Sequence, residues 1–592
     1  MVSEKPLDVS SLSSISARNS RDLPSSRPPH TILEKITTAR SLPAEPEDTS
    51  SSPAAIARIP TREDGTPYPS GAPLGLIVLA LCLAVFLMAL DNSIITTAIP
   101  RISDDFNSLS DVGWYGAAYL LTQASLQLLF GRFYTYLPTK LVFLAAISIF
   151  ELGSLICGVA PNSVTLIVGR AIAGIGAAGI FSGGLLILAH SLPLAKRPLY
   201  TGLIGGMYGI ASVAGPLLGG AFTDRVSWRW CFYINLPIGA VTLVVITVFY
   251  HDPAPQRDSS AAAENGGTTT PTTLLGKIRR FDPVGNALFM PAVVSLLLAL
   301  QWGGTTYPWS SPRIIALFVV AVVLLAAFLG VQVYLSLYSS TPGNATLPLR
   351  ILRNRSVWAS GFFSFTQGSS FFIFIFYIPI WFQAVQGVSA VDSGIRNLPM
   401  LIANILGSIG AGALVTTFGY YAPFMLASTL FSSVGAGLMT TWTPSSPMGV
   451  WIGYQIILGL GPGFGFQQPL MAVQTVLDMA DVPTGTALIV FLQFLGGALF
   501  IAVGQTVFTN RLAQEIVATL PGVDPAIILA SGATNLKNIL SADQLVQAIA
   551  AYNTALTTTF FVGVGLAVAT LVGSSLVEWK SVKGKNIEMG MA

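Results

Sequence analysis

Charged side chains are scarce in this chain: Asp, Glu, Lys and Arg make up 10% of its 592 residues, against about 25% in ordinary soluble domains. The formal net charge of +3 is too small to indicate a nucleic-acid-binding surface. Only three cysteines are present, and Cys82, Cys157 and Cys231 all lie in or beside apolar segments. That pattern excludes a disulfide framework and a cysteine zinc site.

Histidine is equally rare, with three residues in the whole chain, so no cluster with metal-ligand spacing is present. The sequence also lacks a Walker motif or another phosphate cradle, and no nucleophile–base pair is visible. We therefore expect no cofactor, no metal, no nucleic-acid partner and no enzymatic activity. Energy for any transport has to come from an ion gradient, because the chain carries no site for nucleotide hydrolysis.

Long apolar runs are what the chain does contain. Hydrophobic residues make up 52% of the sequence, and fourteen segments of roughly 20 apolar residues are each long enough to cross a bilayer. A receptor or an anchor needs far fewer spans, so the pattern indicates a protein that moves a solute across a membrane. The expected fold class is an all-α membrane protein with spans at residues 74–99, 112–131, 140–159, 164–190, 200–222, 230–250, 283–302, 313–337, 357–384, 397–418, 421–442, 449–476, 484–508 and 557–577.

The distribution of basic residues predicts the orientation in the membrane. An even number of spans places both termini on one side. Lys and Arg number 22 in the tails and loops on that side and 7 on the other, and the bias survives at 14 against 7 without the N-terminal tail. Because cytoplasmic loops are enriched in Lys and Arg, both termini are expected in the cytoplasm.

The spans fall into two sets of six, with a polar stretch and an additional pair between them. Two repeated halves are typical of transporters that bind substrate near the middle of the membrane. The predicted external loop 509–556 contains apolar residues at helical spacing over 543–552, which fits a helix on the membrane surface, over the outer mouth or against a core. The predicted segments are a disordered cytoplasmic N-tail (1–72), an N-terminal half (73–250), a cytoplasmic linker (251–280), an inserted helix pair (281–340), a C-terminal half (341–577) and a C-tail (578–592).

Three charged residues lie inside the predicted spans, away from the span ends. Asp91 lies in the outer half of the first span, and Arg170 lies at a similar depth in the fourth, about 9 Å below its outer end. A carboxylate and a guanidinium at one depth can pair, and breaking and remaking the pair is a simple proton switch. A static pair, or a wet Asp91 near the external interface, are the alternatives. Glu151, in the third span, is either a second proton site or an acid bonded to its neighbours.

Several amide side chains also lie in the predicted spans. Amides and aromatic rings suit a large, weakly polar organic substrate in a mostly apolar pocket, although a single amide also serves to bond neighbouring helices. The candidate cavity amides are Asn92, Gln123, Gln127, Gln367, Gln467, Gln468 and Gln493, and Gln474 is a further amide within a span. The aromatic residues that accompany them are Trp114, Tyr119, Tyr208, Phe365, Trp381 and Phe466.

Four segments in order resemble a known family, over about residues 74–577. They are residues 90–100 in the first span, 169–176 in the fourth, 209–220 in the fifth, and 377–383 with 393–399 around the ninth and tenth. The chain resembles the major facilitator superfamily, and specifically its fungal, fourteen-span drug:H+ antiporter branch. The fifth-span segment is the most specific and is similar to the antiporter motif of exporters. Its motif residues are Gly209, Gly215, Pro216, Gly219 and Gly220.

The resemblance implies the major facilitator fold, with two six-helix halves plus two inserted helices. It implies alternating access, with spans 1, 4, 9 and 12 lining the cavity. An external proton would bind Asp91 or a coupled acid, Arg170 would take part in the coupling, and a hydrophobic drug, toxin or secondary metabolite would be exported. The expected partners are protons, the lipid bilayer and a small organic substrate, and the chain is expected to act as a monomer. The expected location is the plasma membrane, with the vacuolar membrane as the alternative.

The loop after the second span departs from the family pattern. The family carries an Asp and several basic residues there, whereas this chain has Thr135 at the Asp position and keeps only Gly131 and Lys140. The usual charge latch between the halves is therefore in doubt, and we expect gating to depend on other contacts.

Two other functions fit parts of the pattern. A siderophore or vacuolar amino-acid carrier also has fourteen spans, and it would produce iron-dependent or amino-acid-dependent growth. A transport-inactive nutrient receptor would signal through its tails, but the C-tail of about 15 residues offers little for signalling.

Overall fold

The computed structural model of the chain describes residues 67–106, 108, 111–253, 281–304, 306–338, 345–521, 523–525, 528 and 540–583. The predicted N-tail up to residue 66, most of the linker and the C-tail beyond residue 583 lie outside the described residues.

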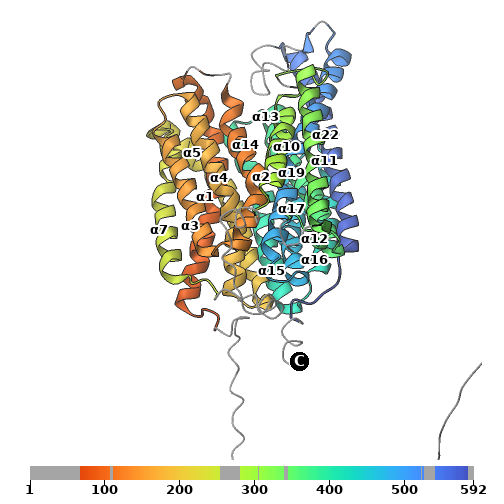
Figure 1. Ribbon diagram of the computed structural model, residues 1–592. Coiled ribbons are helices and arrows are strands. Elements are labelled where there is room, and N and C mark those ends of the chain that lie inside the picture. Colours follow the sequence, from red (N-terminus) through yellow and green to blue (C-terminus); the bar gives the residue numbers. More distant parts are fainter. Residues whose placement is uncertain are drawn as a thin grey trace, which may run out of the picture. The chain divides into compact units, whose positions relative to one another are not determined.

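The first six spans form one helical group (Figure 1). Within it, α3 packs against α4, α1 packs against α5 and α7, and α2 packs against α4. The sixth span is divided at Ile234, three residues before Pro237, which has no backbone N–H to continue the helical hydrogen bonds. The elements are α1 (Ala72–Phe106), α2 (Val112–Tyr136), α3 (Thr139–Gly158), α4 (Ser163–Ser191), η2 (Leu194–Lys196), α5 (Arg197–Arg225), α6 (Trp230–Tyr233) and α7 (Asn235–Phe249).

The last six spans form the second group, in which α13 packs against α19 and α22, and α15 and α16 pack against α17. The two inserted helices pack against each other, and the first of them also contacts α2 and α19, one helix from each group. The elements are α10 (Pro283–Trp302), α11 (Pro312–Tyr338), α12 (Leu349–Leu352), α13 (Arg355–Gln386), α14 (Ala390–Arg396), α15 (Leu398–Phe418), α16 (Ala422–Met439), α17 (Met448–Gly465), α18 (Gln468–Val476), α19 (Val482–Thr519) and α22 (Ala542–Leu576).

Thirteen of the described helical segments are long and apolar enough to cross a membrane. The remaining predicted span is α2, whose mean hydropathy is lowered by Gln123, Gln127 and Arg132. With 25 residues it is about 37 Å long, which exceeds the roughly 30 Å hydrocarbon core. The prediction of an all-α membrane fold is confirmed.

The helix ends follow from local sequence. Asn162 accepts a hydrogen bond from the Thr165 backbone N–H at 2.9 Å and caps α4. Ser541 and Gln544 form a capping box that starts α22. At the end of α15, Gly419 adopts a positive φ of 89°, which a residue with a Cβ rarely tolerates.

Much of the predicted external loop 509–556 is helical and continuous with the neighbouring spans. Helix α19 continues to Thr519 and α22 begins at Ala542, so the predicted helix at 543–552 is the first part of the last span. No proline or glycine lies between it and that span, so the backbone hydrogen bonds continue unbroken. Ala548, Ala551 and Tyr552 are buried in a cluster with residues of α13 and α19.

The predicted span 449–476 is interrupted where the sequence suggested one helix. Helix α17 ends at Gly465, and α18 begins at Gln468. Pro469 has no N–H to donate to the carbonyl of Gly465, so the helical ladder breaks there. The break exposes Phe466 and Gln467 to the interior, where discontinuous helices often line binding sites.

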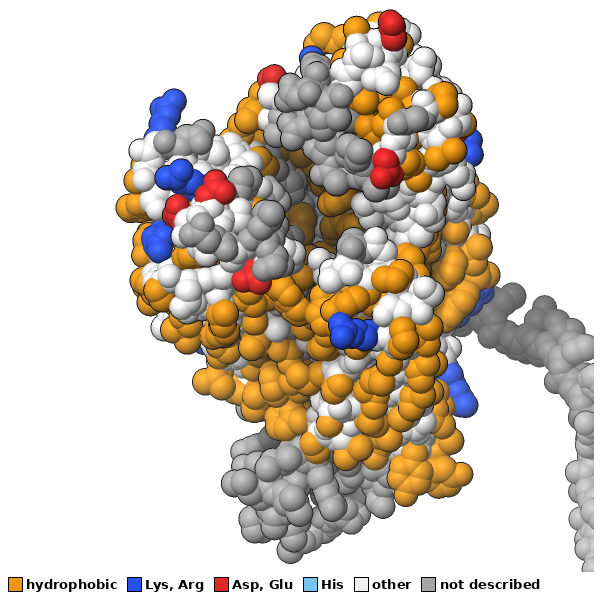
Figure 2. Space-filling view, turned by 90° about the horizontal axis from the view of Figure 1, so that it is seen from above, with side chains coloured by type: hydrophobic (Ala, Val, Ile, Leu, Met, Phe, Trp, Pro, Cys, Tyr) orange, Lys and Arg blue, Asp and Glu red, His pale blue; other side chains and the backbone are white. Residues whose placement is uncertain are grey.

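The two groups meet along α5 with α15 and along α2 with α19. Polar contacts between the groups lie where α5 begins and α15 ends. There, Ser408 Oγ donates to the Gly202 carbonyl at 3.1 Å, and the Leu199 N–H donates to Thr416 Oγ1 at 3.2 Å. On the face from which α22 starts, Figure 2 shows a hollow with hydrophobic side chains in its walls.

The loop after α2 makes its polar contacts within its own group. Thr135 Oγ1 donates to the Gly131 carbonyl of the same helix at 2.9 Å. Lys140 Nζ donates to the Thr247 carbonyl of α7 at 2.7 Å. Gly131 instead brings α2 close to α19, since a Cβ there would collide with Ala487. Close packing therefore holds the halves together at Gly131, and the Arg197 guanidinium of α5 also donates across the halves to Gln474 of α18.

Candidate functional site

A buried ion pair joins α1 to α4. Arg170 Nη1 contacts the Asp91 carboxylate at Oδ2, and both side chains are fully buried (0% exposed). Arg170 Nε also donates to the Tyr115 carbonyl at 2.7 Å, and the guanidinium carbon lies 4.5 Å from the centre of the Tyr119 ring. The two residues that the sequence placed at one depth are thus in contact, and α2 holds the guanidinium from a second side.

The second oxygen of the carboxylate is bonded from α7. Asn235 Nδ2 donates to Asp91 Oδ1 at 3.2 Å and to Ser154 Oγ on α3 at 3.1 Å. Asn235 and Ser154 are both fully buried. Ionised Asp91 therefore has partners for both oxygens, as a buried charge requires. The sequence analysis did not select Asn235, although it is an amide in an otherwise apolar span.

Glu151 lies one helical turn from this bridge. Both of its carboxyl oxygens are buried and have no hydrogen-bond partner among the described residues. Oε1 lies against Gly239, where an added Cβ would collide with the carboxyl group. Ser154 follows Glu151 by three residues, and Gly239 follows Asn235 by four, which places each pair one turn apart. A row of polar groups thus runs from Asp91 to Glu151 between α3 and α7.

The glycine motif of α5 brings that helix close to α1 beside the ion pair. A Cβ at Gly215 would lie 2.8 Å from Ser93 Cβ, and one at Gly219 would collide with the Ile94 carbonyl. Ser93 Oγ donates to the Ala211 carbonyl at 2.9 Å and joins the two helices. Gly220 has open space where its Cβ would be. Close packing therefore explains two of these glycines but not the third.

The other two motif residues have different surroundings. Gly209 faces α15, where an added Cβ would collide with Ile405. Pro216 lies inside α5 and removes one backbone hydrogen bond, to the carbonyl of Ser212. The motif thus gives α5 close contacts with both α1 and α15 and a weakened backbone between them.

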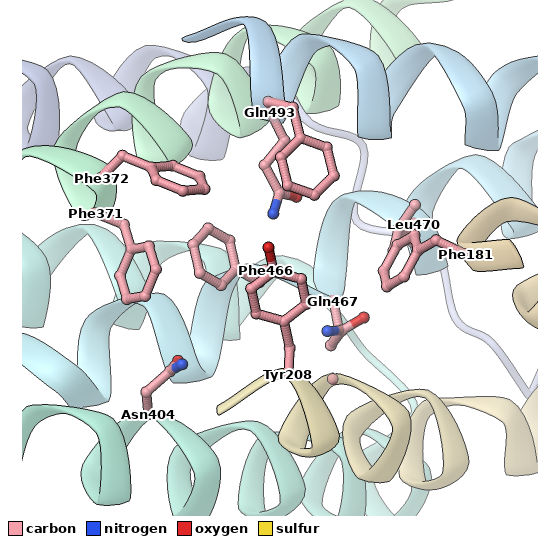
Figure 3. A pocket seen from close by; sticks show the side chains of 11 residues that line it. Phe181, Tyr208, Phe371, Phe372, Asn404, Phe466, Gln467, Leu470 and Gln493 are labelled. Carbon is pink, nitrogen blue, oxygen red and sulfur yellow. The ribbon is translucent and has the colours of Figure 1, made fainter. Parts of the chain in front are cut away.

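Two adjoining cavities lie between the halves. Residues of α4, α5, α13, α15, α18, α19 and the break between α17 and α18 line the first, and residues of α1, α2, α5, α10, α13 and α19 line the second. The predicted cavity spans 1, 4, 9 and 12 each contribute lining residues to at least one cavity. Helices α5, α13 and α19 contribute lining residues to both cavities, and α5 and α19 were not predicted to do so. Figure 3 shows the first cavity, where aromatic rings surround a few amides. No charged side chain is among the lining residues of either cavity.

The predicted amides divide between cavity walls and helix contacts. Asn92, Gln123 and Gln127 line the second cavity, and Gln467 and Gln493 line the first.

Gln367 and Gln468 are not among the residues that line these two cavities. Gln367 Nε2 instead donates to Ser432 Oγ at 3.0 Å, between α13 and α16. Gln474, the further amide of that span, accepts a hydrogen bond from Arg197 Nη1 at 3.4 Å.

Several lining residues were missed by the sequence analysis. Phe371 and Phe372 on α13, Phe494 on α19 and Asn404 on α15 face the first cavity. The phenylalanine-rich run of the ninth span was a usable signal for the first two. For Asn404, the signal was a lone amide in an apolar span.

Comparison with known proteins places these features in a family. The family model described as Major Facilitator Superfamily matches residues 81–501. The "MFS-type efflux pump MFS1" of Trichophyton rubrum is 54% identical over 523 residues, which cover 88% of this chain and 94% of that protein. The "Efflux pump roqT" of Penicillium rubens is 54% identical over 507 residues (86% and 91%). The "Aspyridones efflux protein" of Neocamarosporium betae is 51% identical over 521 residues (88% and 90%).

Solved structures share the fold at low sequence identity. The human organic anion transporter MFSD10 (TETRAN) superposes with a TM-score of 0.51 at 14% identity and covers 84% of this chain and 100% of its own. The proton:xylose symporter XylE gives a TM-score of 0.52 at 14% identity, with 86% and 97% covered. With its family match, its relatives and its two helical halves around a central cavity, this chain belongs to the major facilitator superfamily.

Proposed function

We propose that this chain is a proton-coupled efflux transporter that exports small, hydrophobic organic molecules, such as toxins or secondary metabolites, by alternating access. Relatives at about half identity are called efflux pumps, and one is named for the export of aspyridones. The cavity walls of aromatic rings and amides suit weakly polar organic compounds. The chain is a transporter rather than an enzyme, and a single copy supplies both cavities, so it acts as a monomer.

The buried pair of Asp91 and Arg170 carries the proposal for proton coupling. A fully buried carboxylate with both oxygens bonded is stable only while the guanidinium remains beside it. A proton that binds Asp91 removes the negative charge and leaves Arg170 without a counter-charge. Loss of one partner from a buried pair typically costs about 3–5 kcal/mol. That energy is enough to shift a two-state equilibrium by two to four orders of magnitude.

The direction of transport follows from where the pair becomes accessible. The halves touch where α5 begins and α15 ends, the face that the basic residues place in the cytoplasm. The hollow on the opposite face (Figure 2) admits external protons and releases substrate. Both termini then lie in the cytoplasm, and the plasma membrane is the proposed location. A fluorescent fusion found only on the vacuole would overturn that location but not the chemistry.

Inverted membrane vesicles provide the test of the proposed function. An inward-acid proton gradient is expected to drive accumulation of lipophilic compounds such as N-phenylnaphthylamine, at least fivefold above vesicles without the protein. A protonophore is expected to remove that difference, and added ATP is expected to have no effect once the gradient is fixed. Accumulation that persists without a proton gradient would show that the energy source is different.

Glu151 is proposed as a second proton site linked to the first. The bridge of Asn235 and Ser154 stands between the two acids, and a proton on Glu151 removes the cost of an unpartnered buried charge. Glu151→Gln keeps the shape and is expected to lower the number of protons moved per substrate by about half, with transport retained. The ratio of proton to substrate flux in vesicles measures this. An unchanged ratio would leave Glu151 as a structural acid.

A further inference from the structure

The inserted helix α10 forms one wall of the second cavity. Helices α2 and α19 touch at Gly131, where an added Cβ would lie 2.8 Å from the Ala487 Cβ. Toward the opposite end of α2 the second cavity lies between them, because Leu120 of α2 and Ala498 of α19 both line it. Helix α10 contacts both helices and supplies Leu297 to the same cavity. It therefore closes the gap between the halves on this side.

Aromatic contacts hold α10 against both halves. The ring centres of Phe289 on α10 and Phe491 on α19 are 5.2 Å apart. Farther along the helix, those of Trp302 and Trp114 on α2 are 5.9 Å apart. Both spacings are within the range of interacting aromatic pairs, about 4.5–7 Å. Leu297 lies between these two positions on α10, so the backbone that carries it is held on either side.

The second cavity has a polar side and an apolar side. Its hydrogen-bonding side chains come from α1, α2 and α5 and are Asn92, Gln123, Gln127 and Tyr208. The lining residues that α10, α13 and α19 supply are all apolar. A charged ligand would lose its hydration without gaining a counter-charge, which is costly. The ligand that fits is uncharged, with hydrogen-bonding groups along one edge and an apolar face toward α10 and α19.

We infer that Leu297 sets the breadth of the molecule that the second cavity accepts. The inserted helix α10 is then part of the substrate site and not only a spacer beside the halves. Leu297 has this role only if the chain takes up uncharged organic molecules, so the inference rests on the proposed function. Because α10 is packed against α2 and α19, its backbone does not move aside for a broad ligand. The size of the Leu297 side chain therefore decides how much room remains.

Changes in the size of this side chain have opposite expected effects on broad and narrow ligands. In an apolar pocket, the fit of a single methylene changes selectivity about 10-fold to 200-fold. Leu297→Ala shortens the side chain and makes room for a broader ring system, whereas a narrow ligand gains no new contact. Leu297→Phe enlarges the side chain and takes room away from the broad ligand first. The ratio of the two affinities is therefore the quantity to measure.

The test uses the whole protein in nanodiscs and two uncharged fluorescent probes of different breadth. N-phenylnaphthylamine is the narrow probe, and Nile red, with its fused rings and diethylamino group, is the broad one. Saturable binding is measured by fluorescence titration, with empty nanodiscs as the background. Leu297→Ala is expected to lower the Kd for Nile red relative to that for N-phenylnaphthylamine at least fivefold. Leu297→Phe is expected to raise the same ratio at least fivefold.

Leu298 provides the matched control. It is the next residue on α10 and has the same side chain, but it is not among the residues that line either cavity. Leu298→Ala and Leu298→Phe are expected to leave the ratio of the two Kd values within twofold of the wild type. The melting temperature of each variant reports on packing. General loosening of α10 would lower the melting temperature and weaken both probes together, without changing their ratio.

Failure of this role is distinguishable from failure of the proposed function. Wild-type protein that binds neither probe saturably contradicts the uncharged substrate class, and with it both proposals. Wild-type binding with a ratio that both Leu297 variants leave unchanged overturns the role of Leu297 and leaves the export proposal standing. Equal shifts in the Leu298 variants also overturn it, since packing of α10 would then be the cause. Opposite shifts in the two Leu297 variants support the inference without any proton gradient, because only binding is measured.

Discussion

Asp91→Asn is expected to lower proton-driven accumulation of a lipophilic substrate in vesicles by at least a hundredfold. The amide has nearly the shape of the carboxyl group and still accepts a hydrogen bond from Arg170, but it cannot bind and release a proton. Arg170→Ala is expected to cause a similar loss, since it removes the charge that Asp91 contacts. Transport is measured as accumulation driven by an inward-acid gradient.

Stability has to be separated from coupling in these variants. Each single change leaves one charge or polar group buried without its partner, which typically costs about 3–5 kcal/mol. The double variant Asp91→Asn with Arg170→Gln removes both charges together. It is expected to recover the melting temperature lost in the single variants but to remain inactive in transport. Full activity of Asp91→Asn would refute the proton switch, whatever its stability.

Much of this fold was predictable because a bilayer imposes simple rules. Apolar runs of fixed length located the spans, and the range predicted for α10, 283–302, agrees with the structure. The fused helix α22 was not predicted, because hydropathy marks only where a helix lies in lipid. Its first part is less apolar, packs on protein, and continues the same backbone hydrogen bonds. The break before α18 was missed because a proline such as Pro469 also occurs within unbroken membrane helices, as Pro379 does in α13.

The sequence predicted the depth of each site residue in the membrane. It did not predict the direction in which each side chain points from its helix axis. Depth alone brought Asp91 and Arg170 together, because both positions could be counted from helix ends. Rotation about the axis decides whether an amide faces a cavity or a neighbour, and it depends on packing between distant segments. Gln367 therefore appeared equivalent to Gln493 in the sequence, although it bonds Ser432. The contact of Asn235 with Asp91 joins residues 144 positions apart and left no local signal.

A second large effect is expected where the halves close on the predicted cytoplasmic face. Gly412, near the end of α15, lies against the start of α5. A Cβ there would be 3.1 Å from the Leu199 Cα and closer still to the Pro198 carbonyl. These neighbours are backbone atoms, which cannot move aside as a flexible side chain does. Gly412→Leu is therefore expected to force the two helices apart in this conformation.

The consequence is a shift between conformations rather than general unfolding. Overpacking a close contact typically costs about 1–3 kcal/mol, or roughly 5-fold to 150-fold in the population of the state closed on this face. Transport by Gly412→Leu is expected to fall at least tenfold, because the cycle has to pass through that state. Gly410→Leu provides the matched control, since Gly410 lies on the same helix with open space around its Cβ position.

Cysteine labelling from outside the cell measures the shift directly. The three native cysteines are all buried, so Ala498→Cys in the wall of the second cavity supplies one reporter with little background. A membrane-impermeant maleimide is expected to label that position at least fivefold more slowly with Gly412→Leu, and at the original rate with Gly410→Leu. The outer hollow and the inner α5–α15 contact belong to one conformation. A substitution that breaks the inner contact therefore disfavours that conformation, and the outer hollow is expected to close. Equal labelling and transport in the two variants would show that the α5–α15 contact does not control access.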